Sequence, residues 1–197
     1  MNSVDLKNCP ETPVVNIIHS IGQLGEDIVG LDLGTGDATN LLTMLHNCPN
    51  IKMIHGVDPY KPWSDYLKIP YDGTVMNNFT EFDVELVKGV ALTRQKYAVK
   101  SDRIVLHEKT SIDALADFED KSLDFIFINS YANLQSARAD VAGWWAKLKE
   151  GGIMYGNNWE SYPIQKAVNE FRFSNKVETT LVSYNNMWSF RKQIKAE

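Results

Sequence analysis

The chain has few cysteines: its 197 residues include only Cys9 and Cys48. Two cysteines at this spacing can supply neither the ligands of a structural zinc site nor a disulfide framework. A reducing compartment fits this composition best. We therefore expect a cytoplasmic protein that folds without disulfide bonds or structural zinc.

Basic residues and long apolar runs are also scarce. Lys and Arg number 20 against 25 Asp and Glu, a formal net charge of −5, which argues against an electrostatic interaction with nucleic-acid phosphates. Residues 1–11 are polar and lack the apolar core of a signal peptide, and no run approaches the roughly twenty apolar residues that span a bilayer. We expect a soluble protein with no nucleic-acid or membrane partner, and its oligomeric state stays open.

Apolar residues, in contrast, are sufficient for one full core. They make up 44% of the chain and charged residues 23%, so we expect a single domain over 1–197. Apolar residues at helical spacing after Pro13 predict a helix within 1–25. The irregular segment 59–80 is a candidate lid or substrate loop, because its aromatic residues could cover a pocket; they could equally anchor the loop. These aromatic residues are Tyr60, Trp63, Tyr66 and Tyr71.

Helical and strand patterns alternate along most of the chain. Such alternation predicts an α/β fold with a doubly wound, mostly parallel sheet. Gly151 and Gly152 are predicted to end the helix that starts near Leu134, and Asn185 and Asn186 to turn a C-terminal hairpin. The predicted strands are 28–33, 52–57, 104–106, 123–128, 153–155, 176–183 and 187–191, and the main helices lie near 38–47, 83–98, 134–150 and 163–171.

The most informative motif is a glycine-containing loop between the strand 28–33 and the helix 38–47. Gly34 and Gly36 allow the backbone to turn sharply and to come close to a ligand, because neither has a Cβ. The first amides of the following helix are free to meet polar ligand groups. Asp58, at the end of the next strand, offers acceptors for two adjacent hydroxyls. Together these features predict a nucleotide-cofactor site.

Two residues distinguish this motif from a nicotinamide fingerprint: Thr39 stands at the third glycine position, and Asp32 precedes the loop. With Asp32 and Asp58, the motif resembles the class I S-adenosylmethionine-dependent methyltransferases. The resemblance implies that the motif's acid and loop hold the methionine end of the cofactor and that Asp58 holds the ribose, with S-adenosylhomocysteine as product. The implied cofactor residues are Asp32, Gly34, Thr35, Gly36, Asp37, Asp58, Pro59, Ser111 and Asn129.

A longer resemblance covers about 28–191. The segments 122–129 and 144–153 are similar to the fourth- and fifth-strand regions of a branch of small-molecule O-methyltransferases. It implies a Rossmann-like methyltransferase fold of seven strands whose last strand lies antiparallel beside the fifth. Ser111 matches a position near the adenine in that branch; its other interpretation is a helix cap.

The same branch implies a metal site that this chain has altered. Metal-dependent members carry acids after the fourth and fifth strands, where this chain has Asn129 and the pair Asn157–Asn158. Amides are poor substitutes for the carboxylates that hard cations prefer. We therefore expect a metal-independent protein.

No strong general base stands at the expected strand ends. The candidates for a catalytic role are Asn129, Tyr131, Asn157 and Asn158. Methyl transfer can proceed mainly by positioning, so the lack of a base does not make the protein inert. His55 and His107 are interpreted as structural strand residues.

Three functions remain open from the sequence. The first is metal-independent methyl transfer from S-adenosylmethionine to a small molecule or a sugar. The second is an inactive protein of the same fold that binds the cofactor or a partner, suggested by the asparagine substitutions. The third is a nicotinamide-dependent oxidoreductase, which Asp32 and Thr39 disfavour.

Overall fold

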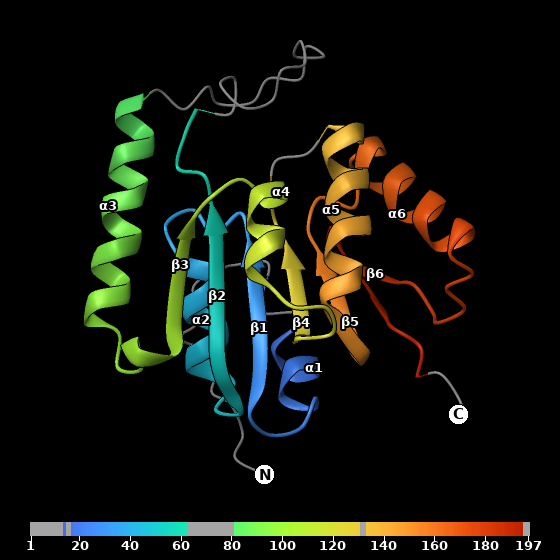
Figure 1. Cartoon of the computed structure of the whole chain (residues 1–197), viewed down its shortest axis with the longest axis horizontal. Helices are drawn as coiled ribbons and strands as arrows, with labels where there is room; N and C mark the ends of the chain where they lie inside the picture. The colour runs from blue at the N-terminus through green and yellow to red at the C-terminus, as the bar shows by residue number, and fades with distance from the viewer. Residues whose placement is uncertain (1–13, 15–16, 63–80, 131–132, 195–197) are drawn as a thin grey trace.

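The computed structural model describes residues 14, 17–62, 81–130 and 133–194, and it contains a seven-stranded sheet in the order β3-β2-β1-β4-β5-β7-β6 (Figure 1). The first five strands in this order are parallel, β7 is antiparallel to β5, and β6 is antiparallel to β7. This confirms the predicted fold class. The strands are β1 (Ile28–Leu33), β2 (Ile51–Asp58), β3 (Ile104–Glu108), β4 (Leu123–Ile128), β5 (Leu148–Gly156), β6 (Val182–Tyr184) and β7 (Met187–Arg191).

Helices cover both faces of the sheet, which creates two hydrophobic cores. One core lies under α1 (Ile18–Gly22), α2 (Thr39–Asn47) and α3 (Glu81–Tyr97). The second core lies under a group of helices that stand in front of the sheet and at its right edge in Figure 1. The latter are α4 (Ser111–Ala114), the 3-10 turn η5 (Leu115–Asp117), α5 (Leu134–Lys147) and α6 (Tyr162–Ser174); a further 3-10 turn, η4 (Ser101–Arg103), precedes β3.

The central strands are buried because both of their faces meet helices. Phe125 and Phe127 of β4 point into the first core, while Ile126 and Ile128 point into the second. A run of apolar residues without alternation is the expected sequence of such a strand. No helix among the described residues is long and apolar enough to cross a membrane.

The sequence predicted that Gly151 and Gly152 end a helix, and this prediction is wrong. Both glycines lie inside β5. The helix α5 stops at Lys147, and β5 runs from Leu148 to Gly156. The pairing with β4 shifts register here, and Gly151 has a φ of +79°, the geometry of a β-bulge. A Cβ on Gly152 would lie 2.8 Å from the Asp124 carbonyl oxygen. These glycines therefore permit a bulge against β4, a role that a helix-stop pattern does not reveal.

The C-terminal hairpin forms where predicted, but its first strand is shorter. β6 covers only Val182–Tyr184 instead of 176–183. Asn185 and Asn186 both have positive φ, +48° and +59°, as a two-residue turn of type I′ requires. The Asn186 side chain also accepts a hydrogen bond from the Glu160 amide at 2.7 Å, so the turn is tied to the segment after β5.

Candidate functional site

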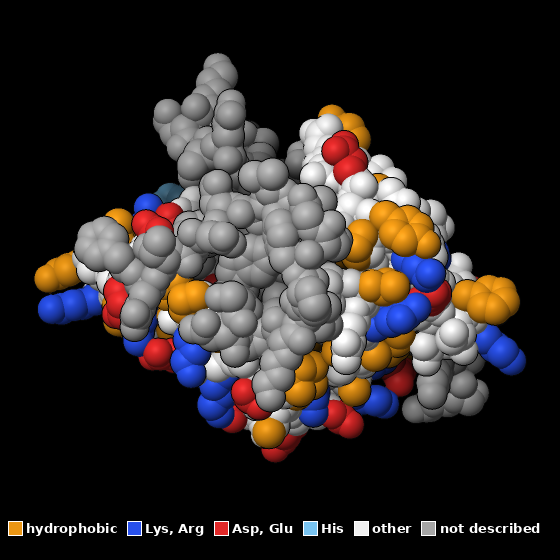
Figure 2. All heavy atoms as spheres, turned by 90° about the horizontal axis from the view of Figure 1, so that it is seen from above, with side chains coloured by type: hydrophobic (Ala, Val, Ile, Leu, Met, Phe, Trp, Pro, Cys, Tyr) orange, Lys and Arg blue, Asp and Glu red, His pale blue; other side chains and the backbone are white. Residues whose placement is uncertain are grey.

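The candidate site lies where the carboxyl ends of β1, β2 and β4 meet. From β1 the chain continues to β2 on one side and later returns to β4 on the other, so β1 marks a topological switch point. The loops there are tied together: the Gly34 amide donates to the Val57 carbonyl, and the Asn129 amide donates to the Leu33 carbonyl, both at 2.8 Å. Figure 2 shows this end of the molecule from above. Among the residues that are coloured there, acidic, basic and hydrophobic side chains are interspersed.

Asp58 organises the loop between β1 and α2. Its carboxylate accepts hydrogen bonds from the Gly36 amide and from the Tyr60 amide, each at 2.9 Å. Burial raises the pKa of Asp58, and these two amides partly oppose the rise. Each carboxylate oxygen keeps a further lone pair, so Asp58 can still accept from two ligand hydroxyls. Pro59 follows it directly in the chain.

Gly34 and Gly36 both have positive φ, +82° and +52°, but their surroundings differ. A Cβ on Gly34 would lie 2.7 Å from the backbone of Ser130 and 2.8 Å from that of Asn129, so the loops after β1 and β4 meet there. Among the residues that the structure describes, a Cβ on Gly36 would contact nothing within 4 Å. This space would let a ligand come close to the backbone at Gly36, as the sequence predicts.

Asp32 is fully buried, and neither of its carboxylate oxygens has a hydrogen-bond partner among the described residues. Burial raises its pKa well above the ordinary value, the charge of Asp58 adds to the rise, and the Leu41 amide in the first turn of α2 partly opposes it. A buried carboxylate with only one amide nearby to stabilise its charge is costly. A cationic group beside Asp32 would compensate for that cost.

The start of α2 is held by Arg94 of α3, a contact that the sequence did not indicate. Its guanidinium lies 2.6 Å from the Asp37 carboxylate, and it also donates to the Asp37 carbonyl at 2.9 Å and to the Thr39 hydroxyl at 2.6 Å. Burial disfavours the Asp37 anion, but hydrogen bonds from Thr39 and Arg94 outweigh burial and lower the pKa of Asp37. Thr39 therefore has a structural partner where a nicotinamide fingerprint has glycine.

Thr35 and Tyr60 complete the loop from inside. The Thr35 hydroxyl donates to the Asp32 carbonyl at 2.8 Å, and the Tyr60 hydroxyl donates to the Gly36 carbonyl at 3.0 Å. Tyr60 is only 7% exposed, so it anchors the loop and does not act as a lid. Trp63, Tyr66 and Tyr71, with the part of the predicted lid from 63 to 80, lie outside the described residues.

Ser111 is not the cap of α4. Thr110 is the N-cap, because its hydroxyl accepts from the Asp113 amide. Ser111 instead donates to the carboxylate of Asp140 on α5 and accepts from the indole N–H of Trp144 at 2.8 Å. The cap interpretation of Ser111 is therefore wrong, and its predicted position beside the cofactor stays a prediction.

The ends of β4 and β5 carry amides in direct contact. The Asn157 side chain donates to the Asn129 side chain at 3.2 Å, and Asn158 has a positive φ of +61°. Tyr131 lies outside the described residues. Among the residues that the structure describes, no group of three or more His, Cys, Asp or Glu could hold a metal ion.

His55 and His107, which looked isolated in the sequence, face each other across β2 and β3. His55 Nδ1 and His107 Nε2 are 3.0 Å apart, and Phe118 packs against both rings. Burial, and next the neighbouring His107, lower the pKa of His55 to about 4. A neutral His55 inside a ring cluster agrees with a structural role.

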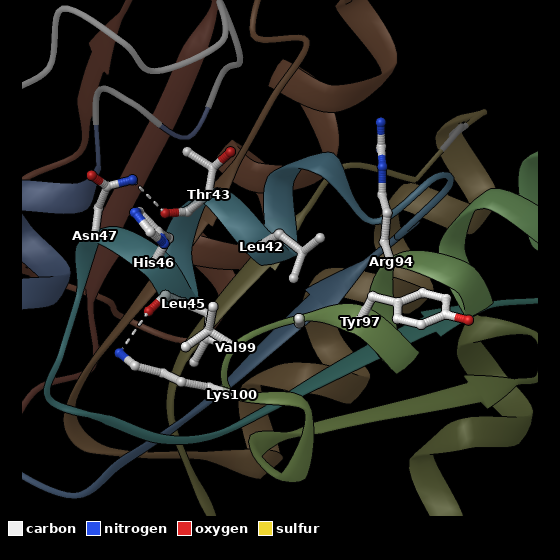
Figure 3. Close-up of a pocket in the computed structure, with 10 residues that line it drawn as sticks. Leu42, Thr43, Leu45, His46, Asn47, Arg94, Tyr97, Val99 and Lys100 are labelled. Atoms are coloured by element: carbon white, nitrogen blue, oxygen red, sulfur yellow. Dashed lines mark hydrogen bonds between the residues drawn. The ribbon is translucent and has the colours of Figure 1, made fainter.

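A groove of about 610 Å³ lies between α2 and the end of α3, and Arg94, which holds the start of α2, is one of its lining residues (Figure 3). Leu42, Leu45, Tyr97 and Val99 are among its lining residues, and the Lys100 ammonium donates to the Leu45 carbonyl at 3.4 Å. None of its lining residues is a predicted cofactor residue.

The sequence assigns the chain to a family. Residues 31–159, more than half of the chain, match the family described as a methyltransferase domain. The protein therefore belongs to the methyltransferase domain family. No curated protein matches the chain in sequence.

Solved structures share the fold at low identity. The O-methyltransferase NovP has a TM-score of 0.67 at 12% identity over 91% of this chain and 81% of its own. The precorrin-6y C5,15-methyltransferase from Geobacter metallireducens has 0.62 at 17% identity over 95% and 92%. A SAM-dependent O-methyltransferase from Thermotoga maritima has 0.61 at 11% identity over 93% and 65%. At such identities the similarity establishes the fold alone, and the enzyme class rests on the family.

Proposed function

We propose that this protein transfers a methyl group from S-adenosylmethionine to a small molecule or a sugar, without a metal ion. The observation that carries the proposal is the buried carboxylate of Asp32, which has no hydrogen-bond partner among the described residues and faces the first turn of α2. S-adenosylmethionine carries an ammonium and a sulfonium, and a cation is what such a carboxylate needs. The family membership supports the same cofactor.

The described residues fit the rest of the cofactor as well. Asp58 is already fixed by two backbone amides and retains lone pairs for the two ribose hydroxyls. The space beside Gly36 admits a ligand close to the backbone. Asp32 would hold the cationic methionine end, Asp58 the ribose, and the loop 34–36 the groups between them.

When bound, the cofactor supplies an electrophilic methyl group. The task of the protein is then to bind, to orient the acceptor and to exclude water, which can provide most of the acceleration of a displacement reaction. Asn129 and Asn157 offer neutral amide donors and acceptors at the ends of β4 and β5. They suit an acceptor that needs orientation by hydrogen bonds more than a metal-bound one.

Ligand-dependent melting tests the cofactor. S-adenosylmethionine and S-adenosylhomocysteine should each raise the melting temperature, because a ligand that binds the folded state stabilises it by mass action. NAD serves as the matched control and should produce no shift. A shift with NAD alone would favour an oxidoreductase, and no shift with either sulfur compound would refute the proposal.

Equilibrium dialysis tests the absence of a metal. The wild-type protein with S-adenosylhomocysteine should bind no stoichiometric Mg²⁺ or Ca²⁺. Binding of one ion per chain that is lost in Asn129→Ala would overturn metal independence while leaving methyl transfer in place. If the cofactor binds and a wide panel of small acceptors and sugars is never methylated, the protein is instead an inactive cofactor-binding member of the family.

A further inference from the structure

Asp140 is a buried acid on α5 that the site described above does not use. The residue is 3% exposed, and its carboxylate accepts hydrogen bonds from the Ser111 hydroxyl and, at 2.9 Å, from the Ser130 hydroxyl. Trp144, one turn further along α5, donates its indole N–H to Ser111. One helix therefore contacts both serines.

The two serines belong to different loops at the carboxyl edge of the sheet. Ser111 begins α4 just after β3, and Ser130 follows β4. The backbone of Ser130 lies against Gly34, at the place that a Cβ of Gly34 would enter. The position of Ser130 thus sets the space on one side of the glycine loop, and Asp140 holds Ser130.

We propose that Asp140 is a positioning residue for the cofactor site, because its carboxylate joins the loop after β3 to the loop after β4 and keeps the latter against Gly34. This role rests on the proposed cofactor. It deepens that proposal by naming a residue that contacts no ligand itself but fixes two loops that line the ligand's site.

The chemistry of the position favours this role over simple packing. Burial raises the pKa of Asp140 to about 6, with the two serine hydrogen bonds opposing the rise. An apolar side chain of similar volume would fill the position at lower cost. A carboxylate differs from it in one useful way, since its two oxygens can hold two separate hydroxyl groups at fixed geometry.

The test compares Asp140→Ala with Asp124→Ala, a matched control. Asp124 also accepts two hydrogen bonds, from the Val29 amide and the Lys149 ammonium, both at 2.8 Å, but it lies at the amino end of β4. The dissociation constant of S-adenosylhomocysteine is measured by titration calorimetry at a temperature where circular dichroism shows every variant folded. We expect Asp140→Ala to weaken binding by about tenfold, the scale of one hydrogen bond to a charged group, and Asp124→Ala to lower only the melting temperature.

Further variants keep the role testable if Asp140→Ala does not fold. Ser130→Ala and Ser111→Ala each remove one of the two hydrogen bonds, and each should weaken binding by a smaller factor than Asp140→Ala. Asp140→Asn retains an acceptor oxygen and should restore part of the affinity. Hydrogen exchange should also rise at Ser111 and Ser130 in Asp140→Ala and stay unchanged there in Asp124→Ala.

The outcomes separate the two proposals. Failure of the wild-type protein to bind S-adenosylhomocysteine would overturn the proposed function and this role with it. Binding by the wild type, with equal affinity in Asp140→Ala and Asp124→Ala, would overturn the positioning role alone. If only the serine variants can be measured, wild-type affinity in both would overturn it equally.

Discussion

The two halves of the sheet's carboxyl edge differ in charge. The β1–β2 half carries two carboxylates, the buried Asp32 and the half-buried Asp58, and burial raises the pKa of each. The β4–β5 half ends in two amides, Asn129 and Asn157, which bond to each other at 3.2 Å. Acids suit a cationic ligand, and paired amides suit a neutral one. Under the proposed function, the β1–β2 half would hold the cofactor and the β4–β5 half would face the acceptor.

The two halves meet at Gly34, and there we expect the largest effect of a single substitution. Gly34→Ala should lower the free energy of unfolding by about 3 kcal/mol, because it adds a strained positive φ to a collision with the Ser130 backbone. Urea denaturation measures this. Gly36→Ala is the control and should cost about 1 kcal/mol, since its Cβ would enter open space. Equal losses would mean that the loops after β1 and β4 are not in contact.

Asp58→Ala tests the acidic half directly. It should weaken S-adenosylhomocysteine binding by about 1–3 kcal/mol, because the ribose hydroxyls lose their acceptors and the Gly36 amide loses its anchor. Calorimetry measures the dissociation constant. Asp117→Ala removes the same charge from a carboxylate paired with Lys109 and should leave binding unchanged. Unchanged affinity in Asp58→Ala would place the ribose elsewhere.

The double variant Asn129→Asp, Asn157→Asp replaces the two amides of the β4–β5 half with carboxylates, as in the β1–β2 half. Two carboxylates at this separation repel, so stability should fall by about 1 kcal/mol, and Ca²⁺ should recover it. Thermal melts with and without Ca²⁺ measure this, with the wild type as a control that does not respond. A wild-type response as large as that of the variant would remove the contrast between the two halves.

The two halves should also differ in how stability depends on pH. Asp32 and Asp58 have raised pKa values, so they bind protons more tightly in the folded state than in the unfolded state. Their contribution to stability is therefore fully present below pH 3.8, the ordinary carboxyl pKa, and is lost as the pH rises through their folded pKa values. Asp32→Asn should therefore lose less stability than the wild type between about pH 4 and pH 8 in urea titrations without ligand. Parallel curves would show that Asp32 does not titrate in this range.

Most of the acidic half could be predicted from the sequence because it is local. Asp32, Gly34 and Gly36 lie within five residues of one another, and Asp58 ends the next strand of the β1–α2–β2 unit. Strand and helix periods fix such a unit without reference to the rest of the chain. The glycine pair 151–152 was misjudged because a bulge depends on the neighbouring strand, which a local pattern does not contain.

The contacts that complete the site are long-range, and no local pattern encodes them. Arg94 reaches Asp37 across 57 positions, and Asp140 reaches Ser111 across 29. His55 and His107 looked like isolated residues until the β2–β3 pairing placed them 3.0 Å apart. Each partner is an ordinary polar residue in its own segment, so its role appears only after the segments pack.

The sequence by itself therefore determined the order of helices and strands, the fold class and the glycine loop with its two acids. Tertiary structure decided which loops touch, that Ser111 bonds to Asp140 instead of capping α4, and that Asp32 is buried without a hydrogen-bond partner among the described residues. The physical reason is that backbone periodicity and turn chemistry act over a few residues. Burial, pKa shifts and hydrogen bonds between loops depend on which surfaces the folded sheet brings together.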